Sequence, residues 1–215
     1  MTQRSVLVRN PSGLHARPAA RFVQTAKRFA SKVHVASPRG DGDGKSILSV
    51  LQLGVESGST LDLTCEGQDE EQAIGVLAEL VESGLGEGVV LYRSVVTAVG
   101  SGVAGALAGG RLEFFAEAAP VELQPTSALH RPAARPCGRL HPGVQIRVGT
   151  WTTTVTGVGG EADRGLAEAG HLLLKLGGGM ADLPEQVAVQ GSPGTVPAPG
   201  DDFWIVEPER DGAGA

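Results

Sequence analysis

Residues 10–20 read Asn10-Pro11-Ser12-Gly13-Leu14-His15-Ala16-Arg17-Pro18-Ala19-Ala20, and the N-terminal half of the chain is organised around this stretch. A strand-like run, residues 5–9, precedes the turn Pro11-Ser12-Gly13. A helix is predicted to begin near His15, because four residues after it have the spacing of one apolar face: Ala19, Phe22, Val23 and Ala26. The first N–H groups of a helix lack intrahelical partners, and their partial positive charge suits an anion. The stretch therefore places an imidazole nucleophile, His15, and a cation, Arg17, at an anion-binding helix start.

A lone histidine at a helix start is most often a solvated capping residue, but the neighbours of His15 point to chemistry. The stretch resembles the phosphorylation-site motif of HPr, the histidine phosphocarrier of the bacterial sugar phosphotransferase system. The resemblance covers residues 1 to about 86, through Gly44–Leu51 to the acidic helix start Glu66–Glu71. It implies that enzyme I phosphorylates His15 at Nδ1, with Arg17 neutralising the added charge.

Residues 1–86 are predicted to form a strand, helix, strand, short hairpin, short helix, strand and helix. Alternating apolar positions indicate a sheet with one buried face: Val6, Val8, Val33, Val35, Leu61, Leu63 and Cys65. The last helix has an acidic first turn and an apolar face of Ala73, Ile74, Leu77, Leu80 and Val81. Helices on one face of an antiparallel sheet make an α+β open-faced sandwich, the fold that the resemblance also implies. Cys65 is then a core residue.

A second landmark, Lys45-Ser46-Ile47, begins the predicted short helix. Ser46 has the position of a helix N-cap, and capping alone would explain a serine there. In many HPr proteins the serine at this position is phosphorylated by a regulatory kinase, so the resemblance implies Ser46 as a possible phosphoserine. It also implies that Ile47, Leu48 and Leu51 form the apolar patch on which partners dock; the alternative is that some of them are core.

Composition limits the classes of function. The chain has 215 residues, two cysteines and a net charge of −6, which argues against a nucleic-acid partner. No apolar run approaches the roughly 20 residues of a membrane span, and the N-terminus lacks a signal-peptide pattern. Two cysteines in different predicted domains form no disulfide framework, so a cytoplasmic location is expected. We expect no cofactor and no metal site; the aspartates of the loop 39–44 lack the bidentate Glu of a calcium loop.

The second half of the chain has a different pattern. Glycines at 84, 86 and 88 divide the HPr-like domain, 1–86, from a linker, 87–92. Short strand-like runs separated by Gly and Pro turns then predict a mainly-β small barrel or sandwich over 93–207, followed by a flexible tail, 208–215. The predicted strands are Val95–Val99, Leu112–Phe115, Val144–Val148, Thr152–Val155, His171–Leu176, Gln186–Val189 and Phe203–Val206. Two short helices are predicted, Val103–Ala108 and Ala162–Ala169.

An acid-free window lies between Glu122 and Glu161, within an otherwise acidic domain. It carries basic residues whose field suits an anionic group, although a solvated basic loop would look the same: His130, Arg131, Arg135, Arg139, His141 and Arg147.

The domain as a whole resembles the glucitol/sorbitol-specific enzyme IIA of the same phosphotransferase system. The matching motifs are Thr97–Gly100, Glu117–Pro120, His141–Gly143, Thr154–Gly159, Leu166–Lys175 and Leu183-Pro184. The family pattern has its active histidine ten residues after the proline that corresponds to Pro120, so the resemblance implies that His130 is phosphorylated. Arg131, Arg135 or Arg139 would then assist it.

Other candidates in this half have simpler explanations. His141 precedes a Pro-Gly turn and His171 begins a strand, so each is more simply structural; nothing in the spacing of the three histidines requires a metal site. Cys137 is more simply a small loop residue than a nucleophile. The chain departs from the family pattern after His130, where a second histidine is replaced by the segment 131–136, and at Glu185, where the family has glycine.

These features favour a fused phosphocarrier. Enzyme I would phosphorylate His15, His15 would pass the group to His130, and His130 would pass it to a membrane-bound IIB/IIC permease that imports a polyol such as sorbitol. The ten residues of the boundary segment 83–92 reach at most about 35 Å when extended, so the step between histidines can require two copies of the chain. The main rival is a regulatory interaction protein that reports metabolic state through His15 and Ser46 and carries a degenerate IIA-like module. A hydrolase is disfavoured, because no Ser-His-Asp or metal constellation is visible.

Overall fold

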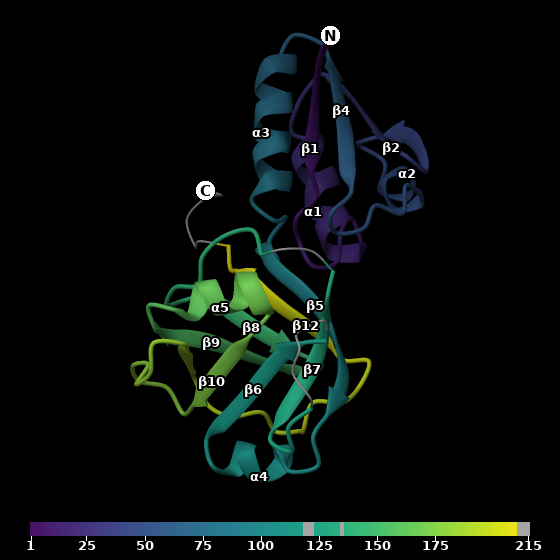
Figure 1. The fold of residues 1–215 in the computed structure, drawn as a ribbon. Helices are drawn as coiled ribbons and strands as arrows, with labels where there is room; N and C mark the ends of the chain where they lie inside the picture. Colours follow the sequence, from purple (N-terminus) through teal and green to yellow (C-terminus); the bar gives the residue numbers. More distant parts are fainter. Residues whose placement is uncertain (118–122, 134–135, 210–215) are drawn as a thin grey trace. The chain divides into compact units, whose positions relative to one another are not determined.

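A computed structural model of the chain describes residues 1–117, 123–133 and 136–209. The chain divides into two compact units (Figure 1). The first unit comprises Met1–Val89 with the chain after Glu207, and the second comprises Val90–Glu207. Among the described residues, no helix is long and apolar enough to cross a membrane.

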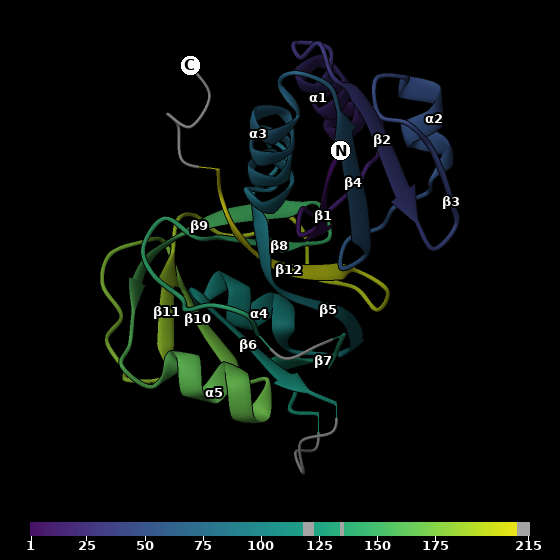
Figure 2. The same ribbon diagram turned by 90° about the horizontal axis from the view of Figure 1, so that it is seen from above.

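The first unit has four strands and three helices. In chain order they are β1 (Thr2–Leu7), α1 (Ala16–Ala26), β2 (Lys32–Ser37), β3 (Gly40–Asp43), α2 (Ile47–Gln52), β4 (Thr60–Glu66) and α3 (Glu70–Glu82). The strands form an antiparallel sheet in the order β1-β4-β2-β3. Figure 2 shows α1 and α3 on one side of this sheet. The α+β open-faced sandwich that the sequence predicts is therefore confirmed.

The core of this unit lies between the sheet and the helices. Val6 on β1 pairs in register with Leu61 on β4, and both side chains are buried. Phe22 of α1 and Leu77 of α3 are fully buried against the same core. Cys65 is also buried, and burial raises the pKa of its thiol, in keeping with a structural role.

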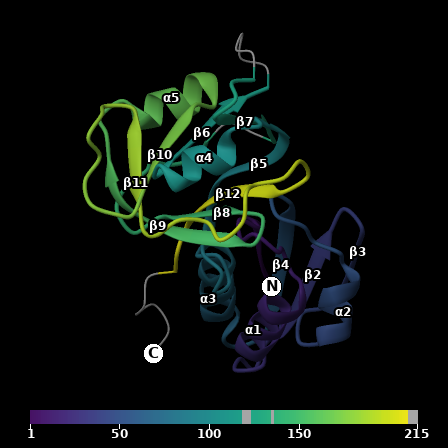
Figure 3. The same ribbon diagram turned by 90° about the horizontal axis from the view of Figure 1, so that it is seen from below.

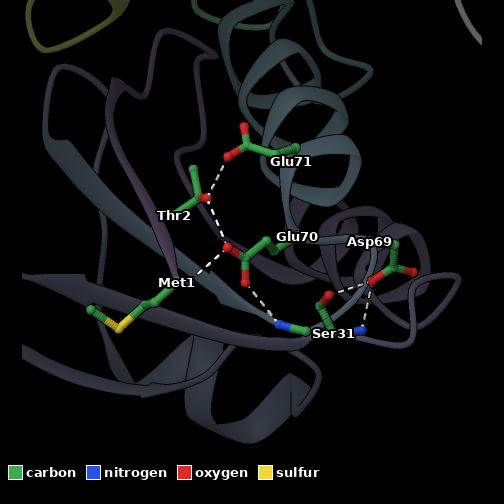
Figure 4. A network of polar contacts seen from close by, with 7 residues as sticks. Met1, Thr2, Ser31, Asp69, Glu70 and Glu71 are labelled. Atoms are coloured by element: carbon green, nitrogen blue, oxygen red, sulfur yellow. Dashed lines mark hydrogen bonds and ion pairs between the residues drawn. The ribbon is translucent and has the colours of Figure 1, made fainter.

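The start of α3 is tied to the rest of the unit by polar contacts (Figure 4). Asp69, the N-cap residue, accepts hydrogen bonds from the Ala30 and Ser31 amides at 2.7 and 2.8 Å and from the Ser31 hydroxyl. Glu70 accepts from the Met1 amine at 2.6 Å and from the Gly67 amide at 2.9 Å. These donors stabilise the ionised carboxylates. The hydrogen bond from the Ser31 hydroxyl contributes most to lowering the pKa of Asp69 from 3.8 to about 2, and the Ala30 and Ser31 amides add to it.

This network predicts acid sensitivity in the first unit. Because the folded pKa of Asp69 lies below its ordinary value, its stabilising effect is full above pH 4 and is lost as the pH falls through about 2. Asp69→Asn is expected to flatten the pH dependence of stability in that window, measured by hydrogen exchange of the β4 amides. Asp62→Asn, at an exposed position of β4, is the control. An unchanged slope in Asp69→Asn would contradict the prediction.

The second unit is a closed barrel of eight strands with two short helices (Figure 3). The strand order around the barrel is β10-β11-β9-β8-β12-β5-β7-β6. The elements are β5 (Val89–Val99), α4 (Val103–Ala108), β6 (Arg111–Ala116), β7 (Ser127–Pro132), β8 (Gln145–Val148), β9 (Trp151–Val158), α5 (Ala162–Ala169), β10 (Leu172–Leu176), β11 (Gln186–Val189) and β12 (Asp202–Glu207). The mainly-β prediction is confirmed, and both helices have their predicted bounds.

One strand of the barrel is absent from the sequence-based prediction. β7 contains His130, Arg131 and Pro132, residues with little preference for strands, and the sequence pattern predicts no strand there. It is nevertheless hydrogen-bonded on both sides, antiparallel to β5 and parallel to β6. The backbone hydrogen bonds to β5 and β6 hold this segment as a strand, although its residues favour strands little.

The boundary between the units also differs in detail from expectation. β5 begins at Val89, inside the segment 87–92 that was expected as a linker. Glu87 belongs to the first unit. Residues 210–215 of the expected tail lie outside the described residues.

Candidate functional site

His15 lies at the start of α1, as the sequence predicts. It is the N-cap residue, with extended backbone angles of φ −89° and ψ 166°, and its side chain makes no capping hydrogen bond. His15, Ala16 and Arg17 are exposed, whereas Pro18 and Ala19 turn into the core. The imidazole is therefore open to solvent at a helix end whose first amides have no intrahelical acceptor.

The turn before His15 depends on Gly13. Its φ is +64°, and a Cβ at this position would lie 2.2 Å from the Val55 carbonyl oxygen, so only glycine fits. The Leu14 amide donates to the same carbonyl at 2.9 Å. This close approach anchors the turn to the segment after α2 and fixes where the chain enters α1.

Arg17 supplies a free cation near this helix end. Its guanidinium forms no ion pair with any carboxylate of the described residues, whereas Arg4 and Arg39 pair with Glu82 and Glu56. An unpaired guanidinium beside free helix amides is a favourable setting for a phosphoryl group.

The short helix α2 presents the residues expected to bind partners. Its N-cap is Ser46, whose Oγ accepts from the Ser49 amide at 3.4 Å. Ile47, Leu48 and Leu51 are 38%, 69% and 38% exposed. Val50 is fully buried. Ile47, Leu48 and Leu51 thus form an exposed apolar surface, and the core contribution of α2 comes from Val50.

His130 lies inside the barrel, with no exposed surface. Its side chain points inward from β7 among three aromatic rings, those of Tyr92, Phe114 and Phe203, at centroid distances of 5.8, 6.2 and 5.2 Å. Nδ1 is 2.6 Å from the Ser94 hydroxyl and Nε2 is 2.7 Å from the Gly170 carbonyl oxygen. Both ring nitrogens are therefore engaged.

These contacts determine the protonation of the His130 ring. A backbone carbonyl can only accept, so Nε2 carries the proton, and Nδ1 accepts from the Ser94 hydroxyl. Burial lowers the pKa of the imidazole, while the bond to Gly170 opposes that shift. The ring is a neutral imidazole whose one lone pair, on Nδ1, points at Ser94. A phosphoryl donor can reach it only if this part of the barrel opens.

Sequence reasoning did not anticipate the residues that hold His130. Ser94 lies on β5, and Gly170 caps α5 in a left-handed conformation with φ +58°. A Cβ on Gly170 would lie 2.6 Å from the Cβ of Ala116, so glycine is needed for this approach. Gly170 directly follows the predicted helix Ala162–Ala169, but nothing local indicates that its carbonyl meets His130.

One of the arginines considered as helpers of His130 points away from it. Arg131 is exposed on the outer face of β7, and its Nε donates to Glu117 at 2.9 Å, which raises the pKa of the guanidinium. Adjacent residues of a strand face opposite sides, so His130 and Arg131 point apart. Arg139 is exposed, and Arg135 lies outside the described residues.

His141 and His171 have carboxylate partners. Nε2 of His141 is 2.6 Å from Glu207, and Nε2 of His171 is 2.9 Å from Glu113. His171 also stacks on Phe115 at a centroid distance of 4.6 Å. Cys137 is exposed, with its thiol 3.2 Å from the Val90 carbonyl.

The two halves of the chain match two family models. Residues 2–83 match the phosphotransferase-system HPr component phosphorylation site, and residues 91–202 match the glucitol/sorbitol-specific IIA component. Among curated relatives, the multiphosphoryl transfer protein of Salmonella typhimurium is 42% identical over 85 residues, 38% of this chain and 23% of that protein. The phosphocarrier protein HPr of Borreliella burgdorferi is 39% identical over 83 residues, 39% of this chain and 96% of that protein.

Two solved structures also resemble parts of the chain. The HPr-C-His structure from Thermoanaerobacter tengcongensis is 44% identical, covering 41% of this chain and 100% of its own, with a TM-score of 0.40. The phosphotransferase-system IIA component from Enterococcus faecalis is 19% identical, covering 53% of this chain and 98% of its own, with a TM-score of 0.45.

Proposed function

We propose that this chain, which belongs to the glucitol/sorbitol-specific IIA family over residues 91–202 and fuses that domain to an HPr domain over residues 2–83, relays a phosphoryl group through two histidines. The group passes from enzyme I to His15 and from His15 to His130. From there it passes to a membrane-bound IIB/IIC permease that imports and phosphorylates a polyol such as sorbitol. The observation that carries this proposal is the open His15 imidazole at the first turn of α1, beside an unpaired Arg17.

The chemistry at His15 is an in-line displacement at phosphorus. A ring nitrogen of His15 forms a new N–P bond while the N–P bond of the donor breaks, so no water or cofactor is consumed. Such transfers need positioning and charge neutralisation more than covalent help from the protein. The free amides at the start of α1 and the Arg17 guanidinium are suited to holding the three phosphoryl oxygens.

The second step requires a conformational change. His130 is buried, with Ser94 and Gly170 on its two nitrogens, so an acceptor state must release at least the Ser94 contact. The neutral ring supports this role, because a protonated imidazole has no lone pair for phosphorus. We propose that docking of a phosphorylated HPr domain, from the same chain or another copy, favours that open state.

Partner binding and regulation complete the proposal. The exposed apolar surface of Ile47, Leu48 and Leu51 is suited to docking enzyme I and the IIA domain. Ser46, at the edge of this surface, is a possible target of a serine kinase, and a phosphate there would add charge that weakens apolar docking. We place the relay in the cytoplasm, where both cysteines would stay reduced.

Phosphoryl label from phosphoenolpyruvate, supplied through enzyme I, tests the relay. Both His15 and His130 are expected to carry label in the wild-type chain, because each is a link of the same path. His130→Ala is expected to keep label on His15 and to lose it from the second unit, as measured by mass spectrometry of proteolytic fragments at alkaline pH. His171→Ala is the matched control, because it removes a histidine of the same unit that lies just before β10 and pairs with Glu113. Wild-type label confined to His15 would contradict the second step.

The burial of His130 favours one alternative. A barrel that never opens would leave the second unit as a binding module, and the chain would report metabolic state through His15 and Ser46. Sugar-dependent loss of label from the chain supports the carrier; stable label on His15 with an inert His130 supports this regulator.

A further inference from the structure

The turn that leads to His15 is held by a carboxylate from the far end of the first unit. Glu87 Oε2 accepts from the Asn10 side-chain amide at 2.8 Å, from the Ser12 hydroxyl at 2.6 Å and from the Ser12 backbone amide at 3.2 Å. Glu87 is 75 residues from Ser12 in sequence. Three donors on one carboxylate oxygen make a specific clamp rather than an incidental surface contact.

The Asn10 side chain connects Glu87 to the turn before His15. Asn10 is fully buried, and its side-chain amide donates both to Glu87 and to the Gly13 carbonyl at 2.8 Å. The backbone bond across the turn, from the Gly13 amide to the Asn10 carbonyl, is long at 3.4 Å. The amide bridge is therefore a principal restraint on this turn, and Glu87 sets the orientation of the bridging group.

Glu87 is itself held firmly. The segment after α3 folds back on itself, and a Cβ on Gly84 would lie 2.2 Å from the Gly88 carbonyl oxygen. The Glu87 amide donates to the Gly84 carbonyl at 2.9 Å, and Leu85 is 1% exposed in the core. The carboxylate thus projects from an anchored turn, so it can transmit a defined position to residues 10–13.

We infer that Glu87 is a positioning residue for phosphoryl transfer at His15, acting through Ser12 and Asn10. Ser12 lies three residues before His15, so a shift of the turn moves the imidazole and the start of α1 together. Phosphoryl transfer is sensitive to displacements of this kind, because the reacting atoms must be aligned in line. This inference rests on the proposed role of His15 as phosphoryl acceptor.

The test measures phosphorylation of the full chain by phosphorylated enzyme I at varied enzyme I concentration. Glu87→Ala is expected to lower the rate constant at saturation about five- to ten-fold, the equivalent of one lost hydrogen bond, with KM changed less than about two-fold. Glu87→Gln, which keeps an acceptor oxygen, is expected to recover to within about two-fold of wild type. Ser12→Ala in the Glu87→Ala background is expected to add little, because both changes remove the same contact.

Glu82→Ala is the matched control, since it removes a carboxylate that pairs with Arg4 on the surface of the same unit. The amide NMR signal of Ser12 is expected to move in Glu87→Ala and to stay in place in Glu82→Ala. A wild-type rate constant in Glu87→Ala, or an effect on KM alone, would overturn this inference and leave the relay intact. A wild-type chain that takes no label on His15 would overturn the relay and this inference together.

Discussion

His15→Ala is expected to remove phosphoryl label from the whole chain, including His130. All phosphoryl groups enter through His15 in the proposed relay, and no other described histidine of the first unit sits at a helix start beside an unpaired arginine. Fragments from both units are expected to fall to the background of a reaction without enzyme I. The unfolding midpoint is expected to stay near that of wild type, because the imidazole is exposed and makes no capping bond.

A control variant and a mixture of two variants accompany this experiment. His34→Ala removes the other histidine of the first unit, an exposed residue paired with Asp41, and is expected to keep full labelling. A mixture of His15→Ala and His130→Ala chains is expected to recover label on His130 if transfer crosses between copies. Persistent label on His130 in His15→Ala alone would exclude the proposed order of transfer.

The second large effect is expected inside the barrel. His130→Glu places a carboxylate among Tyr92, Phe114 and Phe203, where it replaces a neutral ring. An uncompensated buried charge costs about 3–5 kcal/mol, so the free energy of unfolding of the second unit is expected to fall by that amount at pH 8. The loss is expected to shrink near pH 5, where a buried carboxyl becomes protonated. Both tryptophans, Trp151 and Trp204, lie in this unit, so their fluorescence reports its unfolding alone.

Two controls identify the cause of this loss. His130→Gln stays neutral and is expected to cost about 1–3 kcal/mol through its lost hydrogen bonds, with little dependence on pH. Arg131→Glu puts a carboxylate on the next residue of β7 but on the exposed face, and is expected to cost at most about 1 kcal/mol. Equal losses of unfolding free energy in His130→Glu and Arg131→Glu would show that His130 is not enclosed. That result would contradict the proposal that the barrel must open before His130 accepts a phosphoryl group.

The exposed surface on α2 shows how far the family resemblance reaches. The resemblance to HPr implies that Ile47, Leu48 and Leu51 form an exposed patch, the alternative being that some of them are core; all three are exposed, while Val50 is buried. At about 100° per residue, these three side chains lie within about 100° of one another on the helix, so spacing alone does not say whether they face the core or solvent. Spacing does not say what covers the exposed ones, and their docking role stays a prediction.

The sequence alone determined the fold of the first unit and the position of its candidate site, because the signals there are local. The turn, the helix start, His15 and Arg17 lie within residues 10–20, and the apolar spacing after them decides which side of α1 is buried. Only the tertiary structure decided the surroundings of His130 and of the turn before His15. Ser94 and Gly170 are 36 and 40 residues from His130 and reach it because the barrel closes, and Glu87 meets Ser12 across 75 residues. Contacts between residues so far apart depend on the packing of whole elements, and no pattern within a short stretch encodes them.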